Sequence, residues 1–201
     1  MTYSINKLGW RTTAAEPGAT VKLLAVDGSP DGGGRTRRAV GAVAAAAVEA
    51  GAELATVGLV ELDGIDQVLA GLDEADAVVL GAPVYRASAA SPLKELLDRI
   101  PRDGAERRSP LAGKAVAIVQ TGASLHHFLA LDGLRNVLAG FFAAHVVPPG
   151  LYVPRDGFDD DRGAGLRQPY AGQARDQGAA LVELARVLQT SKALASLRPQ
   201  A

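Results

Sequence analysis

The chain has 201 residues, 48% of them hydrophobic, and a formal net charge of −1. That length allows one α/β domain with a substantial core, and the nearly neutral charge argues against a nucleic acid or an anionic membrane as a partner. The absence of cysteine excludes disulfides, thiolate metal sites and cysteine nucleophiles, and three histidines leave little for a metal centre.

Residues 1–20 show no hydrophobic period and contain Pro17-Gly18, so we expect them to form an N-terminal extension. They lack the apolar core of a signal peptide, and no apolar run in the chain reaches the ~20 residues of a membrane span. A cytoplasmic location is therefore expected. The domain itself is predicted to occupy residues 21–195, followed by a tail at 196–201.

The segment from Val21 to Val40 predicts a phosphate site. Its apolar run Leu23–Val26 predicts a buried parallel strand, and an alanine-rich helix begins near Arg35 after a loop with three consecutive glycines. Amide N–H groups and the positive end of the helix dipole meet at such a turn. Ser29 and Thr36 add hydroxyl donors, and the Arg35 guanidinium suits a phosphate.

The spacing of this loop separates three kinds of phosphate site. A dinucleotide fingerprint requires a second glycine where Pro30 stands, and a nucleotide P-loop requires glycine at Ser29 and lysine at Arg35. A flavodoxin-type loop, in which hydroxyls and amides hold one terminal monophosphate, fits best. A glycine-rich turn without a ligand stays open as an alternative.

The rest of the chain alternates short apolar runs with amphipathic segments, which is typical of a parallel sheet with helices between its strands. The further predicted strands are 53–60, 76–81, 114–120 and 145–153. The further predicted helices are 65–72, 91–100, 128–142 and 170–195. Pro148-Pro149 cannot lie inside a central ladder, so the last strand is predicted to be at an edge or broken there.

Two of these strands end in segments suited to a ligand. After 76–81, Pro83 directs the chain out of the strand, and Tyr85 is expected to be exposed at the strand's carboxyl end. After 114–120 comes the small-residue turn Thr121-Gly122. In open α/β sheets ligands bind at the carboxyl ends of the strands, so both turns are predicted to lie near the ligand.

Several segments together resemble one family. They are Gly28-Ser29-Pro30 with Arg35-Thr36, then 82–88, 93–98, 113–122 and 127–132. In this order they resemble the NAD(P)H-dependent FMN reductases of flavodoxin-like fold, especially those that supply reduced flavin to two-component sulfonate monooxygenases. The resemblance covers roughly Leu23–Val153. It implies an α/β three-layer sandwich with a five-stranded parallel sheet in the order 2-1-3-4-5.

The resemblance also implies a reaction, in which hydride passes from NAD(P)H to N5 of FMN without an acid or base from the protein. It further implies a homodimer or homotetramer, and a flavin-dependent monooxygenase as a partner. The implied cofactor-binding residues surround the phosphate and the two sides of the isoalloxazine ring: Ser29, Arg35 and Thr36 at the phosphate, Pro83, Val84 and Tyr85 along the ring, and Thr121 and Gly122 on its other side.

Two departures from the family pattern bear on function. Members that release flavin often carry an inserted tyrosine after the aspartate matched by Asp132, where it forms a π-bulge, but here Gly133 follows directly. This favours a firmly bound FMN. Asp31 adds a negative charge to the phosphate loop. A quinone or azo reductase and a non-catalytic flavin-binding electron carrier are the alternatives, and an aromatic content of 4% favours an open flavin face and thus a reductase.

Overall fold

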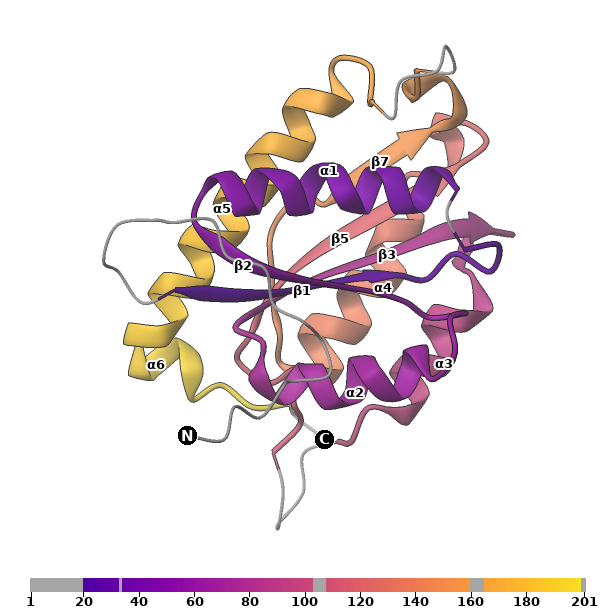
Figure 1. Cartoon of the computed structure of the whole chain (residues 1–201). Coiled ribbons are helices and arrows are strands. Elements are labelled where there is room, and N and C mark those ends of the chain that lie inside the picture. The colour runs from indigo at the N-terminus through magenta and orange to yellow at the C-terminus, as the bar shows by residue number, and fades with distance from the viewer. Residues whose placement is uncertain (1–19, 33, 103–107, 160–164, 200–201) are drawn as a thin grey trace, which may run out of the picture.

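The computed structural model describes residues 20–32, 34–102, 108–159 and 165–199 (Figure 1). A twisted sheet forms the middle of three layers, with helices on both of its faces. Almost all of the predicted N-terminal extension lies outside the described residues. Among the described residues, no helix is both long enough and apolar enough to cross a membrane.

The sheet has seven strands, of which β2-β1-β3-β5-β6 form one hydrogen-bonded path, while β4 pairs with β3 and β7 pairs with β5. All pairs are parallel except β3 with β4. The strands are β1 (Val21–Asp27), β2 (Ala52–Gly58), β3 (Ala77–Tyr85), β4 (Ser88–Ala89), β5 (Ala115–Gly122), β6 (His145–Val146) and β7 (Leu151–Pro154).

The α/β fold with a parallel sheet is therefore confirmed, but the predicted five-stranded sheet is wrong. The strand predicted over 145–153 is two short strands, because the chain leaves the ladder between Val146 and Leu151, where Pro148 and Pro149 cannot donate hydrogen bonds. The remaining additional strand is β4, which no pattern predicted.

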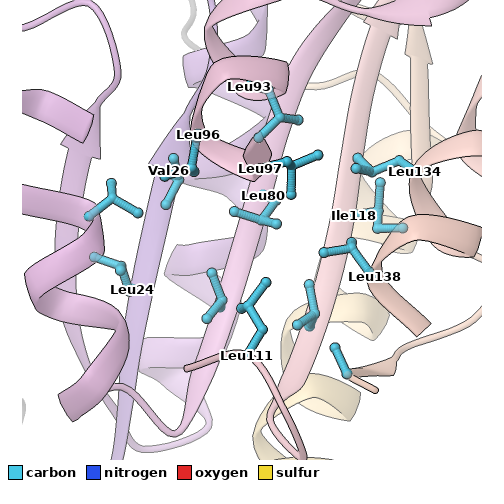
Figure 2. Packing of buried hydrophobic residues seen from close by; sticks show 14 of the residues in the cluster. Leu24, Val26, Leu80, Leu93, Leu96, Leu97, Leu111, Ile118, Leu134 and Leu138 are labelled. Carbon is cyan, nitrogen blue, oxygen red and sulfur yellow. The ribbon is translucent and has the colours of Figure 1, made fainter. Parts of the chain in front are cut away.

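Helices cover the two faces unequally. The helices are α1 (Arg35–Glu49), α2 (Gly64–Glu74), α3 (Ser91–Arg99), α4 (Ala130–Asn136), α5 (Tyr170–Thr190) and α6 (Lys192–Ala195). Helices α1 and α5 pack on one face, and α2, α3 and α4 on the other. Side chains of β1 alternate between these layers, with Leu23 buried toward α1 and Leu24 toward α2, as a strand buried on both faces requires. Figure 2 shows the core on the face covered by α2, α3 and α4. There, Leu93, Leu96 and Leu97 of α3 pack against Leu80 and Val26 of the sheet.

Two predicted helices are interrupted. The segment 128–142 does not form one α-helix: a 3₁₀ turn at Leu125–His127 precedes α4, and a π-helix, η2 (Val137–Phe141), continues it. The long C-terminal helix ends at Thr190 rather than Ala195, because Ser191 leaves the helical conformation and caps α6 by accepting a hydrogen bond from the Leu194 amide.

Candidate functional site

The loop after β1 is held against the end of β3. The Gly28 amide donates a 2.7 Å hydrogen bond to the Gly81 carbonyl, which ties the loop to the neighbouring strand. The next amide, of Ser29, donates to Oδ1 of the buried Asp27 at 3.0 Å. The Ser29 amide is thus used within the loop, which leaves the Ser29 hydroxyl as the group predicted to bind a ligand.

The N-terminus of α1 is suited to an anion. Its N-cap residue is Gly34, no side chain caps the helix, and no acidic residue lies in the first turn. Because the first amides of a helix have no carbonyl partner within it, those of Arg35 and Thr36 remain for an anion placed there. The Arg35 side chain is exposed beside them. These features fit the phosphate group of FMN.

Arg37 connects this helix end to its surroundings. Its guanidinium forms an ion pair with Glu61 after β2, and its Nε lies 3.8 Å from Oδ2 of Asp27. The buried carboxylate of Asp27 therefore has a cation next to it and an amide donor in the loop. Sequence reasoning missed Asp27, although its position between an apolar strand and Gly28-Ser29 was a signal.

Two predicted site residues contact each other. The hydroxyl oxygens of Thr36 on α1 and Thr121 on β5 are 2.8 Å apart and both side chains are buried. The predicted roles of these hydroxyls, on the phosphate and beside the ring, remain untested. The hydrogen bond itself fixes the first turn of α1 against the carboxyl end of β5.

The Thr36–Thr121 pair gives a stability prediction. Thr36→Val leaves the buried Thr121 hydroxyl without its partner and should lower the free energy of unfolding by about 1–3 kcal/mol. The double variant Thr36→Val/Thr121→Val removes both hydroxyls and should unfold nearly like the parent chain. Urea denaturation of the parent, the single variants Thr36→Val and Thr121→Val and the double variant measures the coupling. If the losses of stability in the two single variants simply added in the double variant, the two hydroxyls would not be coupled and the prediction would be wrong.

The second side of the site is a strained hairpin. Strand β3 continues to Tyr85 instead of ending at Gly81, and Pro83 lies within it as the register partner of Thr121. Pro83 is tolerated there because it lies between two ladders: β1 pairs only as far as Gly81, and β4 pairs from Val84 onward. Its carbonyl still accepts a 3.0 Å hydrogen bond from the Ala90 amide. Val84 is half-buried and Tyr85 is 53% exposed.

The turn of this hairpin explains why the sequence did not reveal it. Arg86 and Ala87 join β3 to β4 with φ angles of 52° and 63°. Two positive φ angles are typical of a type I′ turn, which usually contains asparagine, aspartate or glycine. Non-glycine residues in this region carry strain, and such strain is concentrated at functional sites.

The third side is the end of β5, which contains Thr121 and Gly122, so the turn predicted at these two residues is wrong. The Tyr152 hydroxyl on β7 donates a 2.7 Å hydrogen bond to the Ser124 carbonyl, passing over Gly122. A Cβ at Gly122 would overlap the Tyr152 hydroxyl, so only glycine fits there. Burial, and then the neighbouring Tyr170, raise the pKa of Tyr152, so its hydroxyl keeps the donated proton. Sequence reasoning missed Tyr152, since its role depends on strand pairing.

The eight predicted residues thus lie at one edge of the sheet: Ser29 follows β1, Arg35 and Thr36 begin α1, and the other five are the last residues of β3 and β5. In doubly wound α/β proteins, ligands such as nucleotides bind at this edge of the sheet. A model of the family described as NADPH-dependent FMN reductase matches residues 21–157. The chain belongs to this family, and the resemblance predicted from its sequence is confirmed.

Individual relatives agree with this membership. The chain is 36% identical over 91 residues to the NADH-dependent FMN reductase SfnF of Pseudomonas putida, covering 45% of this chain and 46% of that protein. It is 38% identical over 77 residues to an FMN reductase (NADPH) of Escherichia coli, a match that covers 38% of this chain and 37% of that protein. The chain thus spans less than half the length of these two relatives. The crystal structure of an NADH:FMN oxidoreductase (EMOB, apo form) has the same fold, with a TM-score of 0.72 and 21% sequence identity. The match covers 89% of this chain and 95% of that chain.

Proposed function

We propose that this protein is an NAD(P)H-dependent FMN reductase. The observation that carries the proposal is the uncapped N-terminus of α1, with Arg35 beside it, inside the segment that matches the reductase family. We assign the activity to residues 21–195, with 1–20 as an extension and 196–201 as a tail. A cytoplasmic location accords with a chain that contains no cysteine.

Different residues are assigned to the phosphate and to the ring of FMN. Arg35, the Ser29 hydroxyl and the first-turn amides of α1 hold the phosphate of FMN. Pro83, Val84 and Tyr85 lie along one side of the ring, and Thr121 and Gly122 line the other. When bound, FMN supplies the redox chemistry by accepting hydride at N5 from reduced nicotinamide, so the protein supplies position and charge rather than an acid or a base.

The exposure of Tyr85 favours a reductase over a closed electron carrier. Tyr85 is 53% exposed beside the site, so an aromatic residue is open to a second planar molecule. The same open face would suit a quinone or azo acceptor after FMN, which is the second candidate function.

One spectrum and one titration test the proposal. The purified protein is scanned for flavin absorbance, and NADH or NADPH is then added with FMN under anaerobic conditions. We expect nucleotide oxidation that depends on FMN. A protein that binds FMN but oxidises neither nucleotide would be an electron carrier, and a protein that binds no FMN would refute the site.

The same spectrum decides whether FMN stays bound. The missing tyrosine after Asp132 favours a firmly bound cofactor, whereas the π-helix farther along this helix, at Val137–Phe141, resembles the feature of members that release flavin. A yellow protein supports bound FMN. A colourless protein that still turns over added FMN supports delivery of reduced flavin to a flavin-dependent monooxygenase.

We propose that the protein is a homodimer or homotetramer, built on an exposed apolar row along α4 and η2. Leu129, Val137 and Phe141 are exposed, and side chains added at Gly133 or Gly140 would meet open space. In an α-helix every fourth residue advances about 40° around the axis. The π-helix has more residues per turn, so from Val137 to Phe141 it offsets part of the advance made along α4.

The row is self-complementary about Val137. Gly133 and Phe141 lie four residues on either side of it, so an antiparallel copy related by a two-fold axis would set each Phe141 against the other copy's Gly133. The stretch 133–144 contains a single charged residue, Arg135, which is unusual for the exposed side of a helix. A second copy of the chain is the occupant that this symmetry fits.

Val137→Glu should therefore convert the oligomer to a smaller species, because it places two charges at the two-fold axis. Size-exclusion chromatography with light scattering measures the mass. The matched control is Val187→Glu, which changes a comparably exposed valine on α5 and should leave the mass unchanged. A parent chain that is monomeric, or a Val137→Glu variant of unchanged mass, would contradict the proposed surface.

A further inference from the structure

A cleft opens beside the candidate flavin site. It has a volume of about 450 Å³ and is lined by Ala123, Ser124, Leu125, Arg155, Asp156 and Arg167. Gly122, the last residue of β5, pairs with Pro154, the last residue of β7, so Arg155 directly follows the strand next to Thr121 and Gly122. The cleft therefore continues the same edge of the sheet, one strand beyond β5.

The cleft is positively charged. Its lining includes two arginines, Arg155 and Arg167, and one acidic residue, Asp156. Among the described residues Arg155 makes no hydrogen bond or ion pair, and Arg167 has a loose contact of 3.8 Å with Asp159, with half of its side chain exposed. The Ser124 side chain adds a hydroxyl, which can donate to an anion.

The segment that follows β7 is anchored to α1. The Arg38 guanidinium lies 4.9 Å from the centre of the Phe158 ring, and it donates to the Asp159 carbonyl at 3.4 Å. The Asp156 carboxylate acts on Tyr170: burial first, and then this carboxylate, raise the pKa of the Tyr170 hydroxyl. The arginines of the cleft thus project from a backbone that packing holds in place.

We propose that this cleft binds a phosphate group of the nicotinamide nucleotide. The inference rests on the proposed reductase function and extends it to the second substrate. The single phosphate of FMN is assigned to α1, which leaves the pyrophosphate of NADH or NADPH, and the additional 2′-phosphate of NADPH, without a partner. A planar guanidinium matches phosphate oxygens in pairs, and the cleft adjoins the edge where the flavin ring is assigned.

Equilibrium binding tests the cleft separately from turnover. Dissociation constants of NAD⁺ and NADP⁺ are measured by calorimetry with the full chain in saturating FMN, for the parent protein, Arg155→Gln and Arg167→Gln. We expect each variant to raise the constant about tenfold or more, since hydrogen bonds to charged groups are the strong ones. Equal losses for both nucleotides identify the pyrophosphate as the ligand, and a loss for NADP⁺ alone identifies the 2′-phosphate.

Two further variants sharpen the test. Asp156→Asn removes the one carboxylate of the cleft and should tighten nucleotide binding, so its effect has the opposite sign. Arg175→Gln is the matched control, because it removes an exposed arginine on α5, outside the cleft, and should change neither constant. FMN affinity and melting temperature should stay at the parent values in all four variants.

Other outcomes overturn the inference. Unchanged constants for both nucleotides in Arg155→Gln and Arg167→Gln would reject the cleft, as would a parallel loss of FMN affinity. The proposed function fails in a different way, when the parent protein oxidises neither nucleotide with FMN present. A parent that turns over while its two arginine variants bind normally rejects the cleft alone.

Discussion

Arg35→Ala is expected to weaken FMN binding about ten- to hundredfold. The arginine stands in the first turn of an uncapped helix, where its guanidinium adds to amides that already favour an anion. A hydrogen bond to a charged group contributes about 1.5–3 kcal/mol, and that loss corresponds to this change in the dissociation constant. Arg35 is exposed, so its removal should leave the fold intact.

Fluorescence titration of FMN measures the effect, because flavin emission changes on binding. Arg35→Lys is the graded control, since it keeps the charge but loses the planar fork, and we expect an intermediate constant. The melting temperature without FMN should be the same for all three proteins. An unchanged constant in Arg35→Ala would mean that the phosphate binds elsewhere.

The parts of the fold that could be predicted are those set by local sequence. The apolar run at the start of the domain predicts β1 because a strand covered on both faces needs continuous hydrophobic residues. Pro148-Pro149 correctly predicted a break, because proline cannot donate in a ladder. In each case the signal and its consequence lie within a few residues.

The hairpin and the π-helix depend on contacts that no local pattern contains. Arg86 and Ala87 adopt left-handed conformations without the glycine or asparagine that marks such turns, so β4 was missed. The residues 128–142 follow a helical period whether they are α or π, and the neighbouring packing decides. Boundaries therefore failed where tertiary structure overrides propensity.

The candidate site divides in the same way. Ser29 and Arg35 could be chosen because the loop that carries them is continuous in sequence. The contact between Thr36 and Thr121 joins residues 85 positions apart, and only the order of the strands brings their hydroxyls together. Tyr152 belongs to the site through strand pairing alone, so a residue-by-residue search could not find it.

Gly81→Ala should destabilise the protein by about 1–3 kcal/mol, because it overpacks the contact between β3 and α1. A Cβ built at Gly81 overlaps Cγ2 of the buried Val40 and lies 3.4 Å from Cγ2 of Thr36. For a chain of this size each kcal/mol lowers the melting temperature by about 2–4 °C. Calorimetry in the absence of flavin measures it.

A second substitution isolates the cause. Val40→Ala removes the overlapping methyl group and on its own costs about 2 kcal/mol through the lost burial and the cavity. In the double variant Gly81→Ala/Val40→Ala the new methyl occupies part of that space. Its loss of stability should therefore be smaller than the sum of the two single losses by about 1 kcal/mol or more.

Gly41→Ala is the control, on the same helix but facing open space. It should raise the melting temperature, since alanine favours a helix by about 0.8–1 kcal/mol over glycine. Strict additivity in the double variant, or a parent-like Gly81→Ala, would show that α1 moves freely over β3, and the position assigned to the phosphate would lose its support.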